Sequence, residues 1–190
     1  MNIQSLSDYQ FLVPDLLTTK ECNALIELSE KIGYKPASIK GSFEGSNGYS
    51  VRNGINNARA AIENLALAKA LWNRIEEYVP KMVDDHTVTG LNERLRFYCY
   101  TIGQSFGPHT DGYFKRSNGE QSFLTLMIYL NDNFSGGETL FLKRERIIKP
   151  KAGAALIFTH RQWHAGLMVQ SGCKYVLRTD VIYEPRNYKD

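Results

Sequence analysis

Cysteine is scarce in this sequence, and its spacing gives no sign of a disulfide framework. Only Cys22, Cys99 and Cys173 occur among the 190 residues, and no two of them form a C-x-x-C pair. An odd number of cysteines without paired spacing favours a reducing compartment. Residues 1–17 also lack a basic segment leading into an apolar one, so we expect no signal peptide and a cytoplasmic protein.

Long hydrophobic runs and a strong net charge are missing as well. No apolar run approaches the roughly 20 residues that span a membrane, and the net charge is only +3. We therefore expect neither a membrane nor a nucleic acid as a partner. The mixed charges of residues 143–151 are typical of a solvated loop or edge. A hydrophobic fraction of 43% and a length of 190 residues are consistent with one globular domain over residues 1–190.

The first half of the chain is expected to be mixed, and residues 9–17 (YQFLVPDLL) look like a short strand closed by Pro14. Thr18 and Glu21 have the spacing of a capping box and predict a helix that ends at Gly33. Residues 40–57 are rich in Gly, Ser and Asn and predict a long loop. A second helix is predicted from about residue 59 to 78. Its expected core positions are Ile62, Leu65, Ala66, Leu71, Trp72 and Ile75.

From residue 91 onward, short apolar runs separated by turn residues predict β-strands. The expected strands are 93–100, 122–130, 138–142, 146–150, 154–159 and 174–183. Many short strands with little helix between them suggest a sandwich or barrel. We therefore predict an α+β fold with a jelly-roll core at 91–185, supported by the helices and loops of residues 1–90, which also form the substrate rim.

A histidine and an aspartate two positions apart are the first candidate metal ligands. In an extended segment His109 and Asp111 leave the same face and can point into one cavity. The surrounding Gly-Pro and Asp-Gly are equally typical of an ordinary turn. His164, just beyond an apolar strand, would complete the two-histidine, one-carboxylate triad of non-haem Fe(II) oxygenases. The absence of a cysteine near these ligands argues against structural zinc.

A zinc site on a helix is an alternative use of the second histidine. His160 and His164 form H-x-x-x-H. The zinc metalloprotease motif needs glutamate directly after the first histidine, and Arg161 stands there. The preceding residues also read as a strand, so the zinc interpretation is disfavoured.

An ordered set of motifs in the last half of the chain resembles a known family. The set runs from Tyr100, Gly103 and Phe106 through His109-Thr110-Asp111, YLND (129–132), GGETLF (136–141), KPKAGAALIF (149–158) and His164 to GCKYVLRTDVIY (172–183). In this order the motifs resemble the 2-oxoglutarate- and Fe(II)-dependent dioxygenases, in particular the prolyl-4-hydroxylase-like branch, with its double-stranded β-helix. The resemblance implies Fe(II), 2-oxoglutarate and O2, with ascorbate as a further candidate cofactor.

The resemblance also assigns roles to individual residues. It makes His109, Asp111 and His164 the catalytic iron ligands. Lys174, ten residues after His164, would bind the far carboxylate of 2-oxoglutarate, with Tyr129 beside it. Tyr100 and Arg178 would line the same cavity, where they are candidate cosubstrate contacts. The alternatives are an exposed lysine at a strand edge and ordinary packed aromatic residues.

Strand periodicity supports part of this assignment independently. Along 174–181, alternation places Lys174, Arg178 and Asp180 on one face. A cation inside a barrel needs a partner, and a dicarboxylate would supply one for Lys174. Two roles stay open for the other two residues. They form an ion pair with each other, or Arg178 supports a carboxylate while Asp180 selects a basic group of the substrate.

The loop before the β-rich region is the candidate substrate-binding segment. Arg52, Asn53 and Asn57 could engage a peptide backbone or a carboxylate, although Asn-Gly is also a common turn. We expect the protein to hydroxylate a C–H bond of a prolyl residue in a protein or peptide, with succinate and CO2 as coproducts. A free amino acid or other small molecule is the rival substrate, and a non-catalytic β-sandwich binding module is the rival class.

Overall fold

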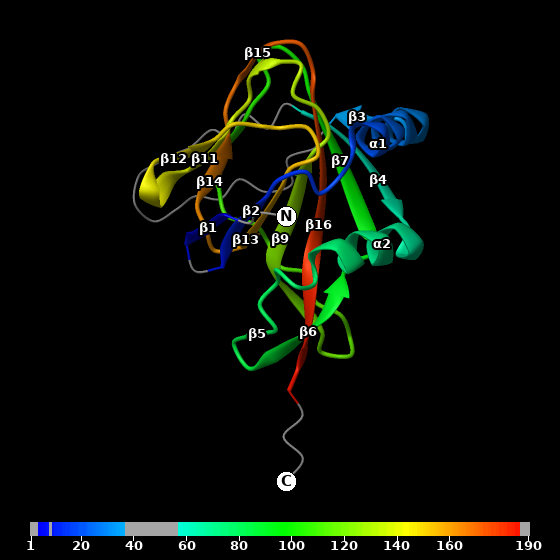
Figure 1. Ribbon diagram of the computed structural model, residues 1–190, viewed down its shortest axis with the longest axis vertical. Helices are drawn as coiled ribbons and strands as arrows, with labels where there is room; N and C mark the ends of the chain where they lie inside the picture. The colour runs from blue at the N-terminus through cyan, green and yellow to red at the C-terminus, as the bar shows by residue number, and fades with distance from the viewer. Residues whose placement is uncertain (1–3, 8, 37–56, 187–190) are drawn as a thin grey trace.

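Two facing β-sheets form the centre of the molecule. The computed structural model describes residues 4–7, 9–36 and 57–186. Within them, a ten-stranded sheet has the order β1-β2-β13-β9-β16-β7-β4-β3, with β6 paired to β16 and β5 paired to β6. A four-stranded sheet has the order β12-β11-β14-β8, and β10 pairs with β15. Figure 1 shows both helices beside β4 and β7, on the side away from the small sheet.

The elements of the large sheet come from both halves of the chain. Its strands are β1 (Gln4–Ser7), β2 (Gln10–Val13), β3 (Lys35–Pro36), β4 (Ala58–Glu63), β5 (Met82–Val83), β6 (His86–Leu91), β7 (Arg94–Tyr100), β9 (Gln121–Tyr129), β13 (Ala155–Thr159) and β16 (Lys174–Pro185). The remaining elements are β8 (Phe106–His109), β10 (Ser135–Gly136), β11 (Thr139–Phe141), η1 (Leu142–Arg144), β12 (Arg146–Ile148), β14 (His164–Gly166), β15 (Val169–Ser171), α1 (Thr19–Ile32) and α2 (Leu65–Ile75).

The strand expected within residues 9–17 is confirmed by β2, and the large sheet also takes in other residues before residue 91. β1 and β2 extend the large sheet beyond β13, while β4 pairs with β7. An uncovered strand edge exposes unpaired backbone groups, and these early strands cover both edges of the central strands. The first half of the chain is therefore part of the sheet as well as its helical support, and the α+β jelly-roll prediction is confirmed.

The predicted boundaries of the first helix are confirmed. Thr18 and Glu21 form a capping box at the start of α1, and Gly33 follows its last residue with φ of 85°. That left-handed backbone conformation favours glycine. The helix begins and ends where its local sequence supplies the required partners.

The second helix is shorter than predicted. Residues 58–63 form β4 instead, because their backbone pairs along β7. Asn64 then starts α2 by accepting a hydrogen bond from the backbone of Leu67 at 2.9 Å. Leu65 is 57% exposed and Ala66 is also exposed, so their predicted core positions were wrong. Leu71 and Ile75 are buried as expected.

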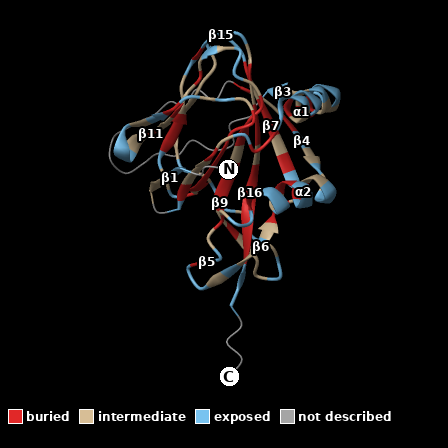
Figure 2. Cartoon of the chain, in the orientation of Figure 1, coloured by how far each residue is buried: buried red, intermediate tan, exposed pale blue. Residues whose placement is uncertain are grey.

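Two apolar layers lie on opposite faces of the large sheet. One packs beneath the helices and includes Ile75, Phe97 and Leu126. The other lies between the sheets and includes Tyr98 and Phe158. Successive residues of a strand point to opposite faces, so β7 supplies both layers. The continuous buried regions of the central strands are visible in Figure 2. No helix among the described residues is long and apolar enough to cross a membrane.

Candidate active site

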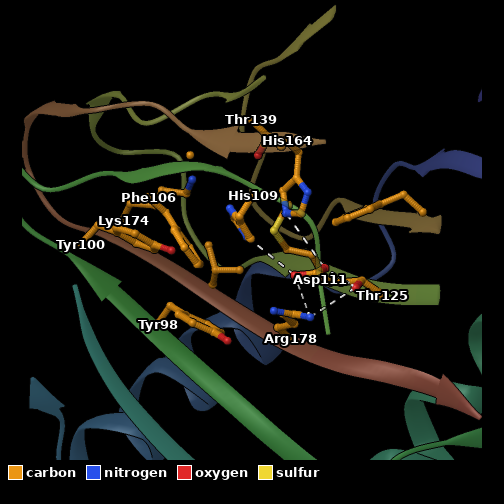
Figure 3. Close-up of a pocket in the computed structure, with 14 residues that line it drawn as sticks. Tyr98, Tyr100, Phe106, His109, Asp111, Thr125, Thr139, His164, Lys174 and Arg178 are labelled. Carbon is orange, nitrogen blue, oxygen red and sulfur yellow. Dashed lines mark hydrogen bonds and ion pairs between the residues drawn. The ribbon is translucent and has the colours of Figure 1, made fainter. Parts of the chain in front are cut away.

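Three side chains converge in the space between the two sheets. His109 is the last residue of β8 and pairs with His164, the first residue of β14. Asp111 follows β8 and points toward both (Figure 3). Its carboxylate oxygens lie 3.6 Å from His109 Nε2 and 4.0 Å from His164 Nε2. The predicted ligand set is therefore brought together by strand pairing across 55 residues of sequence.

Backbone contacts orient both imidazoles. The Nδ1 of His109 lies 2.8 Å from the carbonyl oxygen of Gly107, and that of His164 lies 2.9 Å from the carbonyl oxygen of Gln162. When Nδ1 donates its hydrogen to these oxygens, the lone pair of Nε2 is free to bind a metal. Burial lowers the pKa of His164 to about 4, so its ring is neutral near pH 7. The ring of Phe106 stacks on His109 at 3.7 Å.

The carboxylate of Asp111 is buried, ionised and held from two sides. Thr125 Oγ1 donates a hydrogen bond to Oδ2 at 2.5 Å, and Arg178 Nη2 lies 2.9 Å from Oδ1. Burial alone would raise the pKa of Asp111, but the charge of Arg178, together with the hydrogen bond from Thr125, outweighs it and lowers the pKa. Thr125 lies on the cavity face of β9, and its contact with Asp111 was not predicted from the sequence.

This donor set fits a divalent transition-metal ion. Two neutral imidazole nitrogens and one carboxylate oxygen on one side of a site form the facial triad typical of non-haem Fe(II). The ligand atoms that the three residues offer all lie within 4.8 Å of one another, close enough to surround one ion after small side-chain rotations. Within the described residues, these three side chains form a cluster of potential metal ligands.

A buried lysine faces the same cavity. Lys174 is 3% exposed, and its Nζ donates a hydrogen bond to the carbonyl oxygen of Gly137 at 2.6 Å. The Nζ also lies 5.3 Å from the ring centre of Tyr100 and 5.6 Å from that of Tyr129. Burial lowers the pKa of Lys174 to about 8, although Glu138 opposes the shift. Since no described carboxylate forms an ion pair with it, the geometry suits a carboxylate supplied by a ligand.

Comparisons with known proteins agree with this geometry. Residues 95–179 match the sequence model of the 2OG-Fe(II) oxygenase superfamily. That segment contains all three candidate ligands and Lys174. Over this segment, which runs from β7 into β16, the chain is similar to that superfamily.

The curated proteins that this chain is similar to include prolyl 4-hydroxylases. Prolyl 4-hydroxylase 5 of Arabidopsis thaliana is 28% identical over 132 residues, covering 67% of this chain and 42% of that protein. This chain thus spans about half the length of the curated relatives that it matches.

Solved structures show the same fold. The viral collagen prolyl hydroxylase of Paramecium bursaria Chlorella virus-1, in its 2OG complex, has a TM-score of 0.64 at 21% identity, covering 96% of this chain and 100% of that one. A Trichoplax adhaerens prolyl hydroxylase in complex with a peptide fragment of hypoxia inducible factor has a TM-score of 0.64 at 16% identity, covering 92% and 84%.

The other residues predicted to contact a cosubstrate lie around Lys174 and Asp111. Tyr100, Lys174 and Arg178 line the cavity. Tyr129 is fully buried behind it, with its hydroxyl 2.7 Å from Thr139 Oγ1. Its contact with the cosubstrate stays a prediction. Gly137, in the turn before β11, supplies the carbonyl oxygen that accepts the hydrogen bond from Lys174.

Arg178 and Asp180 form the predicted ion pair, with Arg178 Nη2 3.6 Å from Asp180 Oδ1. Each of them also has a closer partner. Arg178 lies 2.9 Å from Asp111, and Asp180 lies 2.5 Å from Arg96. Asp180 does not line the described part of the cavity, so the structure gives no support to its predicted substrate contact.

The predicted substrate loop is only partly described. Arg52 and Asn53 lie outside the described residues, and their role stays a prediction. Asn57, the first residue of the described range 57–186, is 2% exposed and acts to lower the pKa of Tyr100. It does not line the described cavity.

His160 is not a third histidine ligand. Its ring lies 2.8 Å from Ser122 Oγ and 3.1 Å from Thr125 Oγ1, and burial lowers its pKa to about 4. The zinc-helix alternative fails because residues 155–159 form β13 and His164 begins β14. His160 instead supports Asp111 by accepting a hydrogen bond from its backbone at 2.9 Å.

Proposed function

We propose that this chain is an Fe(II)- and 2-oxoglutarate-dependent dioxygenase that hydroxylates a C–H bond of a prolyl residue in a protein or peptide, releasing succinate and CO2. The observation that carries the proposal is the shared cavity, which brings together a facial triad and a buried lysine that forms no ion pair with the described residues. A binding module has no evident need for this combination.

Each side chain has a distinct part in the proposed reaction. His109, Asp111 and His164 would hold Fe(II), and the bound iron with 2-oxoglutarate and O2 would supply the oxidising power. Lys174 would bind the far carboxylate of 2-oxoglutarate and so fix its orientation. The apolar side chains of Phe106, Met127, Phe158 and Val176 line the cavity and would limit the access of water.

The prolyl substrate is proposed from the relatives. Curated relatives are named prolyl 4-hydroxylases, and one structural neighbour is a prolyl hydroxylase with a bound peptide fragment. A free amino acid is the alternative within the same chemistry. A role for ascorbate and a cytoplasmic location are further proposals, the second supported by the absence of disulfides among the described cysteines.

An anaerobic titration tests the iron and cosubstrate assignments. Fe(II) and 2-oxoglutarate should give the weak visible charge-transfer band of their chelate with the wild type. The band should be absent in Asp111→Ala and unchanged in His86→Ala, because His86 lies outside the described cavity. A wild type without the band would refute the proposal, and the binding-module class would then be favoured.

A succinate-release screen tests the substrate. It compares proline-containing peptides, free amino acids and methylated nucleic acid, each with and without Fe(II). Release that depends on a proline peptide supports the proposed substrate. Release with free amino acids alone would replace it with the small-molecule alternative.

A further inference from the structure

Two cysteines meet directly behind the proposed 2-oxoglutarate site. Cys99 is on β7, and Cys173 immediately precedes β16. Their sulfur atoms lie 3.0 Å apart, although 74 residues separate them in the sequence. Both side chains are partly exposed, whereas Cys22 is buried elsewhere. The pair is thus accessible to small reagents and close enough to interact.

The pairing of β7 with β16 connects these thiols to the cavity. Lys174 lies opposite Tyr100, and Tyr175 lies opposite Cys99. Because neighbouring residues of a strand point to opposite faces, the thiols lie on the reverse side of the strand pair from Lys174 and Tyr100. Each cysteine is also the residue directly before one of these cavity residues. Any change in the distance between the sulfurs therefore acts on the backbone that carries the cavity residues.

The surroundings favour thiol reactivity. The hydrogen bond between the sulfurs lowers the pKa of Cys173 to about 7 and raises that of Cys99, and a contact with Tyr175 also lowers the pKa of Cys173. A thiolate is the nucleophilic form of cysteine. Cys173 is thereby suited to attack an oxidant, with Cys99 beside it as the resolving thiol.

Closing the pair requires movement next to Lys174. A disulfide bond is about 2.05 Å long, so the sulfurs must approach by about 1 Å. The carbonyl oxygen of Cys173 accepts a hydrogen bond from Asn131 Nδ2 at 2.7 Å, and Lys174 Nζ is held by Gly137. A shift of this segment strains both contacts and displaces the ammonium group from its place in the cavity.

We propose that Cys99 and Cys173 are a redox-modification site at which a peroxide forms a reversible disulfide that weakens 2-oxoglutarate binding. The thiolate of Cys173 attacks one peroxide oxygen, which breaks the O–O bond, forms a sulfenic acid and releases hydroxide. The sulfur of Cys99 then attacks the sulfenic sulfur, and the oxygen leaves as water. The proton that Cys173 gave up on ionising converts the hydroxide to water. Counted from two neutral thiols, the pair thus loses two electrons and two protons, and the peroxide is reduced to two waters. The effect on binding rests on the proposed function; the disulfide itself does not.

Mass spectrometry after hydrogen peroxide treatment tests the bond. The protein is used metal-free, so that peroxide does not react with iron, and Cys22→Ser is the matched control. Wild type and Cys22→Ser should each lose two hydrogen atoms and give a linked peptide containing Cys99 and Cys173, reversed by dithiothreitol. Cys99→Ser and Cys173→Ser should give no such link. The absence of the link in both wild type and Cys22→Ser overturns the proposal.

Calorimetry then tests the consequence for the cosubstrate. With Mn(II) in place of Fe(II), oxidation should weaken 2-oxoglutarate binding about tenfold, since displacements near 1 Å have effects of this order or larger. Dithiothreitol should restore it, and peroxide should not weaken binding in Cys99→Ser or Cys173→Ser. A linked protein with unchanged affinity overturns the regulatory part of the proposal. If the reduced wild type binds no 2-oxoglutarate, the proposed function fails. The linked peptide still tests whether the disulfide forms.

Discussion

The guanidinium group of Arg178 lies 2.9 Å from the carboxylate of Asp111 inside the cavity. Their side chains are 13% and 2% exposed, so water screens the pair poorly. The pair keeps a metal ligand ionised before any metal is present. A cation so close to a metal site also competes electrostatically with the metal. Arg178 therefore stabilises the fold at some cost to metal affinity.

Replacing this arginine should destabilise the metal-free protein. In Arg178→Met the buried carboxylate of Asp111 loses its cation, and removal of one partner of a buried pair costs about 3–5 kcal/mol. Mn(II) should restore part of the loss, because the metal supplies the missing positive charge. Urea unfolding with and without Mn(II) measures both effects.

A surface arginine provides the control for this experiment. The side chain of Arg161 is 90% exposed, so Arg161→Met should change the free energy of unfolding by no more than about 0.5 kcal/mol. An Arg178→Met variant as stable as Arg161→Met would contradict the importance of the buried pair.

Loss of the Thr125 hydroxyl should weaken metal binding without unfolding the protein. Thr125→Val keeps the shape of the side chain but removes the hydrogen bond to Asp111 and the contact with His160. Partners that orient metal ligands typically contribute about 10–100-fold to metal affinity. Mn(II) titration followed by electron paramagnetic resonance should show a loss of this size, and Thr125→Ser should recover most of it. Equal affinities in Thr125→Val and wild type would show that Thr125 does not position Asp111.

The resemblance of the ordered motifs to a known family assigned the ligands and the lysine, and local patterns in the sequence agree with that assignment. His109 and Asp111 share a face through their spacing, and alternation along one strand places Lys174 and Arg178 on the cavity side. The ion pair between Arg178 and Asp111 could not be predicted from the sequence. It depends on how β8 lies relative to β16, and elements that are not neighbours in sequence set that arrangement.

The error in the second helix has a similar cause. The apolar residues near Ile62 fit either a helix or a strand, and short apolar runs do not separate the two. Residues 58–63 form a strand because they pair with β7, and Asn64 then caps the start of the helix. Tertiary pairing thus overrode a helical pattern that was correct for Leu71 and Ile75.

The capping box of α1 should contribute measurably to stability. Thr18→Ala removes the side-chain acceptor for the backbone of Glu21 and should cost about 1 kcal/mol in urea unfolding. The hydrogen bond from Arg74, then that from the backbone of Thr18, lowers the pKa of Glu21 to about 2. A lowered pKa stabilises the fold above the ordinary value of 4.5, and this contribution is lost as the pH falls toward 2.

Glu21→Gln tests the pH-dependent part. Because Glu21 is 38% exposed, solvent screening limits its effect to less than about 1 kcal/mol. The difference from wild type should be present at pH values well above 4.5 and vanish well below it. A difference that stays constant across this range would contradict the assigned pKa. Binding of 2-oxoglutarate should be unchanged in both variants, because α1 lies outside the cavity.

Binding of 2-oxoglutarate should weaken as the pH rises through about 8. Burial lowers the pKa of Lys174 to about 8, so below that pH the ammonium group is charged and attracts the carboxylate. Above it, binding must first return a proton to the amine, and the affinity falls with each further rise in pH. Calorimetry with Mn(II) across this range measures the dependence.

Removing the positive charge of Lys174 should abolish the pH dependence of 2-oxoglutarate binding without destabilising the ligand-free protein. Lys174→Met should bind 2-oxoglutarate at least about tenfold more weakly below pH 8, because one partner of a buried ion pair is gone. The ligand-free variant should be no less stable than wild type, since a buried ammonium group without a carboxylate partner is costly. Lys151→Met, at a lysine whose side chain is 73% exposed, should leave affinity and pH dependence unchanged. If Lys174→Met kept the wild-type profile, another cation of the cavity would hold the carboxylate, and Arg178 is the candidate that the geometry offers.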